Sequence, residues 1–219
     1  MSQQLLKLTS VLSTPFEENC YIAHLVDRSD CLVIDPGLEP EKLIAALEEA
    51  ELAPAAILNT HGHGDHIGGN AAIKERWPES KIVIGKIEAP MLTDPDLNLS
   101  RGFGMGLVSP AADVTLDDGD TFSAADLTVK ALLIPGHSPG HMIYEIEGQE
   151  PPVVMVGDVI FAGSIGRTDF PGGSFDQLRA GIHEKLFTMP DDTRLHPGHG
   201  PATTVDCEKR TNPFVGLDA

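Results

Sequence analysis

Four of the six residues from 61 to 66 carry side chains that bind metal ions well: His61, His63, Asp65 and His66. Glycines stand between them at positions 62 and 64 and disfavour a helix, so this is not a helical His-Glu-x-x-His zinc motif. In an extended segment alternate side chains point the same way, and we expect His61, His63 and Asp65 to face one side. His66 is expected to face elsewhere. Four ligands in so short a stretch predict a two-metal site that is completed from other parts of the chain.

Three further ligand-type side chains lie in turns that follow apolar runs. His137 and Asp158 each come just after a short apolar stretch, and His199 lies in a segment rich in Gly and Pro. A single His or Asp in such a turn is ordinarily a hydrogen-bonding residue. Binding sites in open α/β sheets lie beyond the strand ends. Together with the 61–66 cluster, these three residues therefore predict a shared metal site at one rim of a sheet.

The other histidines and the cysteines show no such pattern. We assign His141 and His196, each near a better-placed histidine, to structural roles or to the support of a ligand. His24 and His183 are expected to be structural. The three cysteines, at positions 20, 31 and 207, lack metal-site spacing, and an odd, sparse set is typical of free thiols in a reducing compartment.

Short strands interspersed with helices must position these residues. Apolar runs predict strands over residues 5–12, 19–26, 31–35, 56–59, 81–85, 127–134, 142–146 and 153–156. Pro40, at a first helical position, is expected to open a helix over residues 41–51. Further helices are predicted over residues 69–76, 175–189 and about 205–210. This alternation is typical of a layered α/β domain.

Two segments carry more specific expectations. Ser174 and Gln177 form a capping box for the helix over 175–189, in which an apolar stripe is expected to face the core: Phe175, Leu178, Ile182 and Leu186. The Gly-rich stretch 100–107 is predicted to be a mobile surface loop.

Composition and charge limit the classes of function. The 219 residues hold 15 Lys and Arg against 33 Asp and Glu, a net charge of −18 that opposes binding to nucleic acids and to anionic membranes. The excess acid favours a soluble monomer or small homo-oligomer. No apolar run approaches the length of a membrane span, and the N-terminus lacks the continuous apolar region of a signal peptide. We therefore expect a cytoplasmic protein with a small-molecule substrate.

The order of these motifs is similar to that of a known family. Thr-His-Gly-His-Gly-Asp-His, Gly-His-Ser-Pro-Gly-His, Gly-Asp and Gly-His-Gly-Pro resemble the metallo-β-lactamase fold superfamily. Four further segments, 19–21, 34–37, 166–173 and 210–214, more narrowly resemble the short, single-domain bacterial members of the glyoxalase-II-like hydrolases (hydroxyacylglutathione hydrolases). The resemblance implies an αββα sandwich, with two mixed sheets flanked by helices, in one domain over residues 1–219. Only 20 residues follow His199, so the C-terminal helical domain with which archetypal glyoxalase II binds glutathione is not expected.

The resemblance also implies a dinuclear metal site and its ligands. One metal would be held by His61, His63 and His137, the other by Asp65, His66 and His199, with Asp158 bridging the two. Imidazoles and carboxylates suit two zinc ions best, and iron or manganese also fit such ligands.

Such a site predicts hydrolysis of a thioester. A hydroxide held between two cations attacks the carbonyl, and a thiol with a pKa of about 8.5 leaves without a dedicated general acid. Asp65, which orients the nucleophile, and Asp158 are the predicted catalytic residues. Arg167 and Arg101 are candidates for binding substrate carboxylates, Arg101 from a loop that could act as a lid. An ion pair of Arg167 with Asp169 that only pins the loop is the alternative.

We expect the substrate to be S-lactoylglutathione or a related hydroxyacyl thioester. The main alternative is a persulfide dioxygenase of the same fold, which keeps a single iron on a subset of these ligands. A metal-stabilised sensor without turnover is a third possibility. A secreted β-lactamase, a flavodiiron reductase and a nuclease of this fold each need a feature that the sequence lacks: a signal peptide, a flavin domain or a basic surface.

Overall fold

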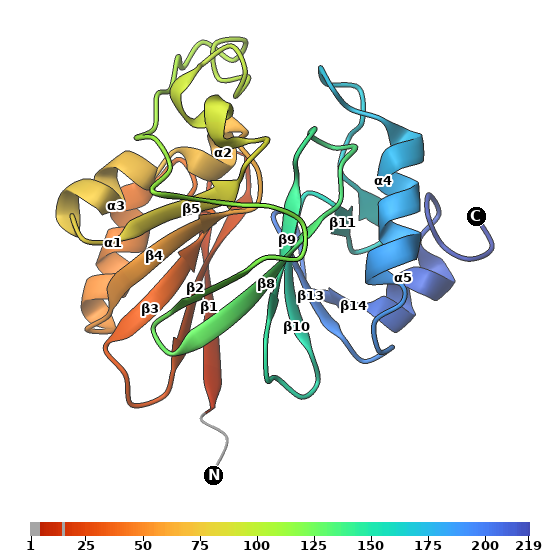
Figure 1. Cartoon of the computed structure of the whole chain (residues 1–219), viewed down its shortest axis with the longest axis horizontal. Coiled ribbons are helices and arrows are strands. Elements are labelled where there is room, and N and C mark those ends of the chain that lie inside the picture. Colours follow the sequence, from red (N-terminus) through yellow and green to blue (C-terminus); the bar gives the residue numbers. More distant parts are fainter. Residues whose placement is uncertain (1–4, 15) are drawn as a thin grey trace.

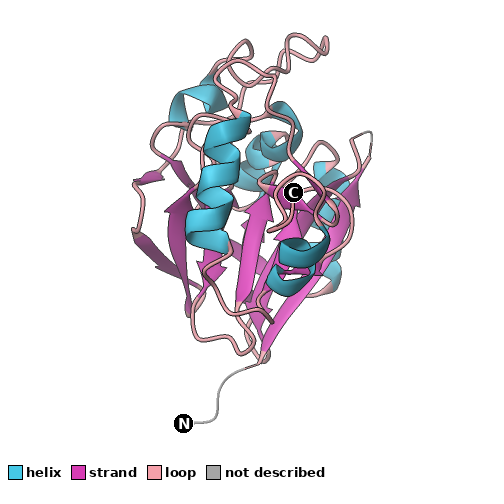
Figure 2. Cartoon of the chain, turned by 90° about the vertical axis from the view of Figure 1, so that its right-hand side faces the viewer, coloured by secondary structure: helices cyan, strands magenta, loops and turns pink. Residues whose placement is uncertain are grey.

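Two six-stranded sheets pack face to face, and helices cover the outer face of each. In this computed structural model, which describes residues 5–14 and 16–219, α1 and α3 lie outside the first sheet, and α4 and α5 lie outside the second (Figure 1). Figure 2 looks onto the side of the second sheet, where helices cover the strands. The predicted αββα sandwich of two mixed sheets is confirmed.

The first sheet is built by the N-terminal half of the chain in simple sequence order. Its two N-terminal pairings are antiparallel and the remaining three are parallel. The strands are β1 (Leu6–Ser13), β2 (Glu18–Leu25), β3 (Asp30–Ile34), β4 (Ala53–Asn59), β5 (Lys81–Gly85) and β6 (Val114–Leu116).

The second sheet has the order β14-β13-β10-β9-β8-β7 and is antiparallel except for the β10–β13 pair. A two-stranded hairpin of β11 (Ile160–Phe161) and β12 (Ser164–Ile165) follows β10. The strands of the sheet are β7 (Thr121–Ala124), β8 (Leu127–Leu133), β9 (Met142–Ile146), β10 (Val153–Gly157), β13 (Arg194–Pro197) and β14 (Thr203–Thr204).

The helices are short and follow the turns between strands. Helix α1 begins at Pro40, as predicted, and Ser174 Oγ accepts a hydrogen bond from the Gln177 N–H to cap α4. The helices are α1 (Pro40–Glu49), α2 (Gly64–Ile67), α3 (Asn70–Arg76), the 3₁₀-helix η1 (Ala89–Thr93), α4 (Phe175–Gly181), its π-helical continuation η2 (Ile182–Leu186) and α5 (Val205–Thr211).

Strand alternation divides the apolar side chains among three cores. On β10, for example, Val153 and Met155 face the first sheet, whereas Val154 and Val156 face α4 and α5. The central core lies between the sheets, and the outer cores lie under α1 and α3 and under α4 and α5. Because both faces of the central strands are covered, their turns are held in fixed positions at the strand ends.

Two details of the helix predicted over 175–189 are wrong. Phe175, assigned to the core stripe, is 38% exposed, because it is the first residue of α4 and precedes the turns that pack on the sheet. The regular part ends in a π-helical turn at Leu186 rather than at Met189. The other three stripe residues are buried as expected.

Candidate metal centre

Four strand ends from both sheets meet at one rim of the sandwich. Segment 61–66 follows β4 of the first sheet, and the turns that carry His137, Asp158 and His199 follow β8, β10 and β13 of the second. The structure thus brings all seven predicted ligands together, in overlapping groups whose ligand atoms lie within 4.8 Å of one another.

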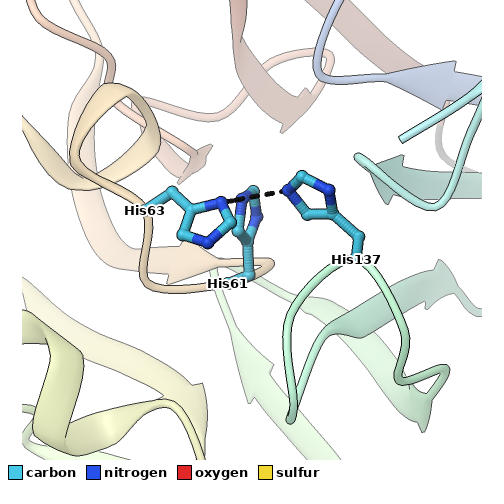
Figure 3. Close-up of side chains that lie close together, drawn as sticks. All are labelled: His61, His63 and His137. Atoms are coloured by element: carbon cyan, nitrogen blue, oxygen red, sulfur yellow. Dashed lines mark hydrogen bonds between the residues drawn. The ribbon is translucent and has the colours of Figure 1, made fainter. Parts of the chain in front are cut away.

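The first group is a triad of imidazoles. His63 Nδ1 lies 3.0 Å from His61 Nε2 and 3.0 Å from His137 Nε2 (Figure 3). Burial lowers the pKa of His61 well below its ordinary value and that of His63 to about 3, so both rings are neutral. All three side chains are buried.

The outer nitrogens of this triad determine where its lone pairs point. His137 Nδ1 donates to the Arg167 carbonyl (2.8 Å), which leaves Nε2 as an acceptor. Thr60 Oγ1 donates to Asp35, so His61 Nδ1 donates to Thr60 Oγ1 (3.1 Å) and its Nε2 is also an acceptor. Three ring nitrogens with at most one proton between them fit a metal ion, which can accept all three lone pairs.

The second group combines Asp65, His66 and His199, and Asp158 lies between the two groups. Asp158 Oδ2 is 3.5 Å from His137 Nε2 and 3.5 Å from His199 Nε2, one nitrogen from each group. Its Oδ1 lies 3.4 Å from His66 Nε2. This single carboxylate therefore has the geometry to join two metal sites.

Unsatisfied polar atoms mark the same place. In the described part of the chain, His66 Nε2 and Asp158 Oδ1 are among the few buried side-chain atoms without a hydrogen-bond partner. Burial opposes charge on both groups, but the Asp158 and Asp65 carboxylates raise the pKa of His66, and His66 in turn lowers the pKa of Asp158. The carboxylates thus favour positive charge at this place, and a bound cation would supply it in place of the proton on His66.

The prediction that alternate side chains of segment 61–66 face the same side is wrong for Asp65. His61 and His63 do face one side together, but Asp65 lies with His66 and His199. The reason is that residues Gly64–Ile67 form one helical turn, α2, in spite of the glycine, and a helical turn sends successive side chains around an axis.

Asp35 supports the second group, a role that we did not predict. It accepts hydrogen bonds from the Thr60 N–H (2.8 Å), the Thr60 hydroxyl (2.7 Å) and His66 Nδ1 (3.1 Å). The carboxylate fixes the ring of His66 with Nε2 toward the site. Its sequence signal is segment 34–37, Ile-Asp-Pro-Gly, which indicates only the family resemblance.

Glu88 is a second supporting residue that sequence reasoning missed. Its buried carboxylate accepts the N–H of Gly62 (2.9 Å), between two ligands, and the N–H of Gly140 (2.6 Å), in the turn that carries His137. One side chain thereby joins the two ligand-bearing turns of the first group. No spacing in the sequence connects Glu88 with either turn.

Segment 19–21, Asn-Cys-Tyr, positions the turn that carries His199. Asn19 Nδ2 donates to the carbonyls of Pro197 (3.1 Å) and Gly200 (2.8 Å), and the Tyr21 hydroxyl donates to Pro197 (2.8 Å). Strand β2 of the first sheet therefore holds the end of β13 in the second.

The histidines assigned to supporting or structural roles lie outside the ligand groups. His141 Nε2 accepts the N–H of Asp158 (3.0 Å), and its ring stacks on His61 with centroids 4.6 Å apart. His183 Nε2 donates to the Val215 carbonyl (2.8 Å), and His196 packs edge-on against Tyr21. His24 lies on β2, with Nδ1 3.1 Å from the Leu25 carbonyl oxygen.

A cavity of about 410 Å³ reaches the ligands. Arg167 lines it, but its guanidinium makes a two-pronged ion pair with Asp169 (2.6 and 2.7 Å). Arg101 pairs with Asp96 (2.7 Å) and is not among the described residues that line this cavity. Substrate binding by either arginine stays a prediction.

Comparison with known proteins agrees with this geometry. Residues 13–199 match the model of the metallo-beta-lactamase superfamily, a span that contains all seven ligand candidates. The chain belongs to this superfamily. It is 36% identical over 209 residues to the hydroxyacylglutathione hydrolase GloC of Haemophilus influenzae, covering 92% of this chain and 94% of that protein.

Solved structures extend the comparison. The BLEG-1 B3 metallo-beta-lactamase matches with a TM-score of 0.90 at 36% identity, over 95% of this chain and 99% of that one. A di-iron-bound form of TTHA1623 matches with a TM-score of 0.81 at 36% identity, over 94% and 99%. ETHE1 of Myxococcus xanthus matches with a TM-score of 0.79 at 25% identity, over 96% and 85%. The His-rich cluster is thus a metal-binding site within a metallo-hydrolase fold.

In the described part of the chain, no helix is both long and apolar enough to span a bilayer.

Proposed function

We propose that this protein is a dinuclear metal-dependent hydrolase of thioesters, similar to glyoxalase II. The observation that carries the proposal is the position of Asp158, whose Oδ2 lies 3.5 Å from a ligand nitrogen of each group. One metal would be held by His61, His63 and His137, the other by Asp65, His66 and His199, with Asp158 as the bridge.

Two bound divalent ions, zinc foremost and iron or manganese as alternatives, supply Lewis acidity and lower the pKa of water to near neutrality. The chain's own residues orient the nucleophile and hold the ligands. Asp158 and Asp65 border the cavity, where Asp158 would bridge the two ions and the Asp65 carboxylate would orient the nucleophile. Asp35 and Glu88 keep the ligands in place.

The cavity supports a thioester rather than an amide. A thiol of pKa about 8.5 departs as a thiolate with little help, whereas an amine must be protonated. We assign no general acid to the cavity wall. S-lactoylglutathione or a related hydroxyacyl thioester is the first substrate to test, in keeping with the GloC relative.

The test combines metal analysis with a substrate panel. The protein is purified with its metals intact, the metals are quantified, and lactoylglutathione is assayed beside other thioesters and a β-lactam. We expect about two metals per chain and turnover of thioesters well above that of the β-lactam. Turnover of no thioester by protein loaded with two metals would overturn the proposal.

A second candidate, a mononuclear-iron persulfide dioxygenase, fits the likeness to ETHE1. It would leave the group of Asp65, His66 and His199 without its ion, and the buried His66 Nε2, which has no hydrogen-bond partner, favours the dinuclear hydrolase. About one iron per chain and oxygen uptake with glutathione persulfide would decide for the dioxygenase.

The expectations for partners, location and oligomeric state are part of the proposal. The net charge of −18 favours small-molecule partners over nucleic acids and membranes, and we propose a cytoplasmic monomer or small homo-oligomer.

A further inference from the structure

We infer that the cavity beside the metal centre selects thioesters that carry an apolar group of aromatic size next to the scissile bond. This inference rests on the proposed thioester hydrolysis and narrows its substrate class. Its starting point is the lining of the cavity, where half of the chain's eight phenylalanines gather: Phe16, Phe103, Phe161 and Phe170. These four residues come from four separate segments, so the apolar wall is built by the tertiary fold.

The aromatic rings extend to the ligand histidines themselves. Phe170 packs edge-on against His63, with ring centroids 5.4 Å apart, and lies 6.3 Å from His137. Phe161 packs edge-on against His199 at 5.8 Å. The rings therefore border both ligand groups, and a substituent next to a carbonyl at the centre would lie against them.

The rim of the cavity continues the apolar surface into solvent. Phe103, on the Gly-rich loop, is 55% exposed and touches Phe16 edge-on at 5.5 Å. Met105, on the same loop, is 40% exposed and also lines the cavity. Removing a large apolar side chain from water lowers the free energy of a complex. The exposed rim therefore favours binding of an apolar group.

Positive charge contributes little to the described lining of the cavity. Arg167 is the only Lys or Arg among the described residues that line the cavity, and Asp169 already occupies its guanidinium, which also lies 4.0 Å over the Phe170 ring. Arg101, on the adjacent loop, is paired with Asp96. The described lining therefore offers an apolar contact, rather than an unpaired cation, to a substituent next to the scissile bond.

The experiment uses two series of thioesters on the metal-loaded enzyme. In the first, the thiol is always N-acetylcysteamine and the acyl group is acetyl or phenylacetyl. In the second, the acyl group is always acetyl and the thiol is N-acetylcysteamine or benzyl mercaptan. We expect kcat/KM to be about tenfold higher for the aromatic member of at least one series. The series in which this occurs shows whether the acyl group or the thiol contacts the phenylalanines.

Phe103→Ala tests the wall directly, since this exposed side chain contributes little to folding. The variant should lower the ratio of kcat/KM for the aromatic to the acetyl member about fivefold, whereas a general structural defect would lower both values and keep the ratio. Phe214→Ala, 47% exposed and outside the cavity lining, is the matched control and should leave this ratio unchanged.

Failure of the inference and failure of the proposed function give different results. Equal turnover of the aromatic and acetyl members overturns the inference and leaves thioester hydrolysis standing. Turnover of none overturns the proposed function, and calorimetry with inert thioethers then decides the inference. S-benzyl-N-acetylcysteamine binding about tenfold more tightly than the S-methyl compound would support the apolar site, and equal binding would overturn it.

Discussion

His196 and His199 lie three residues apart, at the end of β13 and in the turn after it, and their surroundings give them opposite chemistry. Burial favours the neutral form of both rings, but contacts with Asp158 and Asp65 raise the pKa of His199 to about 10. Burial and Arg194 lower the pKa of His196 to about 4. Two identical side chains three residues apart thus belong to different regions, His199 to the metal centre and His196 to a structural region.

The comparison shows that contact with carboxylates, rather than the presence of a histidine, distinguishes the metal centre from its surroundings. Each ligand group contacts Asp158, whereas His196 packs against an aromatic ring. Changes at the centre should therefore alter metal binding and catalysis, and changes at His196 should alter only stability.

Metal removal should have the largest effect. Dialysis against a chelator is expected to abolish thioester turnover and to lower thermal stability, since an ion at a thousandfold excess over its Kd contributes about 4 kcal/mol. Turnover and melting temperature are measured before and after added zinc, iron or manganese. Full activity in the chelated protein, verified as metal-free, would contradict the metal centre.

Asp158→Asn should be the most damaging substitution. The amide keeps the shape but loses the charge between the two groups, and we expect kcat to fall about a thousandfold and the metal content to drop below two per chain. Metal analysis and steady-state kinetics provide the readouts. His196→Asn is the matched control and should retain both metals and turnover; if it loses them as well, the distinction between the two regions fails.

Glu88→Gln should have an intermediate effect. The substitution replaces one of the two oxygens that accept the Gly62 and Gly140 N–H groups with an N–H donor, and the two ligand turns should separate slightly. We expect metal affinity to fall about 10- to 100-fold, measured by competition with a chelator. Glu79→Gln, at an exposed position, is the control, and equal metal affinity in both variants would exclude the positioning role.

The smallest effect should be the pH dependence of stability at His196. Its folded pKa, about 4, lies below the unfolded value of about 6.5, so the unfolded state binds more protons between these values. Stability should fall as pH drops from 6.5 toward 4, by about 1 kcal/mol at this half-buried site. Melting temperatures of the metal-loaded wild type and His196→Asn are compared from pH 7 to 5, and parallel curves would show that His196 does not contribute.

Much of the fold was predictable because strand and helix patterns are local. The apolar runs located most of the long strands, and Pro40 marked the first residue of α1. Short edge strands such as β6 and β14 were missed, since a run of two or three residues carries no periodicity. The helical turn of α2 was missed because contacts override the low helix propensity of Gly64, whose N–H donates to the Asn98 carbonyl.

The sequence alone determined which side chains are available for metal binding and that segment 61–66, His137 and Asp158 each follow a strand, because both are properties of short segments. Only the tertiary structure decided that Asp158 lies between two ligand groups, that Glu88 joins two turns and that four phenylalanines share one wall. These are relations between segments far apart in the chain, and they arise when two sheets pack with their strand ends at one rim. The protonation of His196 and His199 depends on such neighbours too, so residue type could not distinguish them.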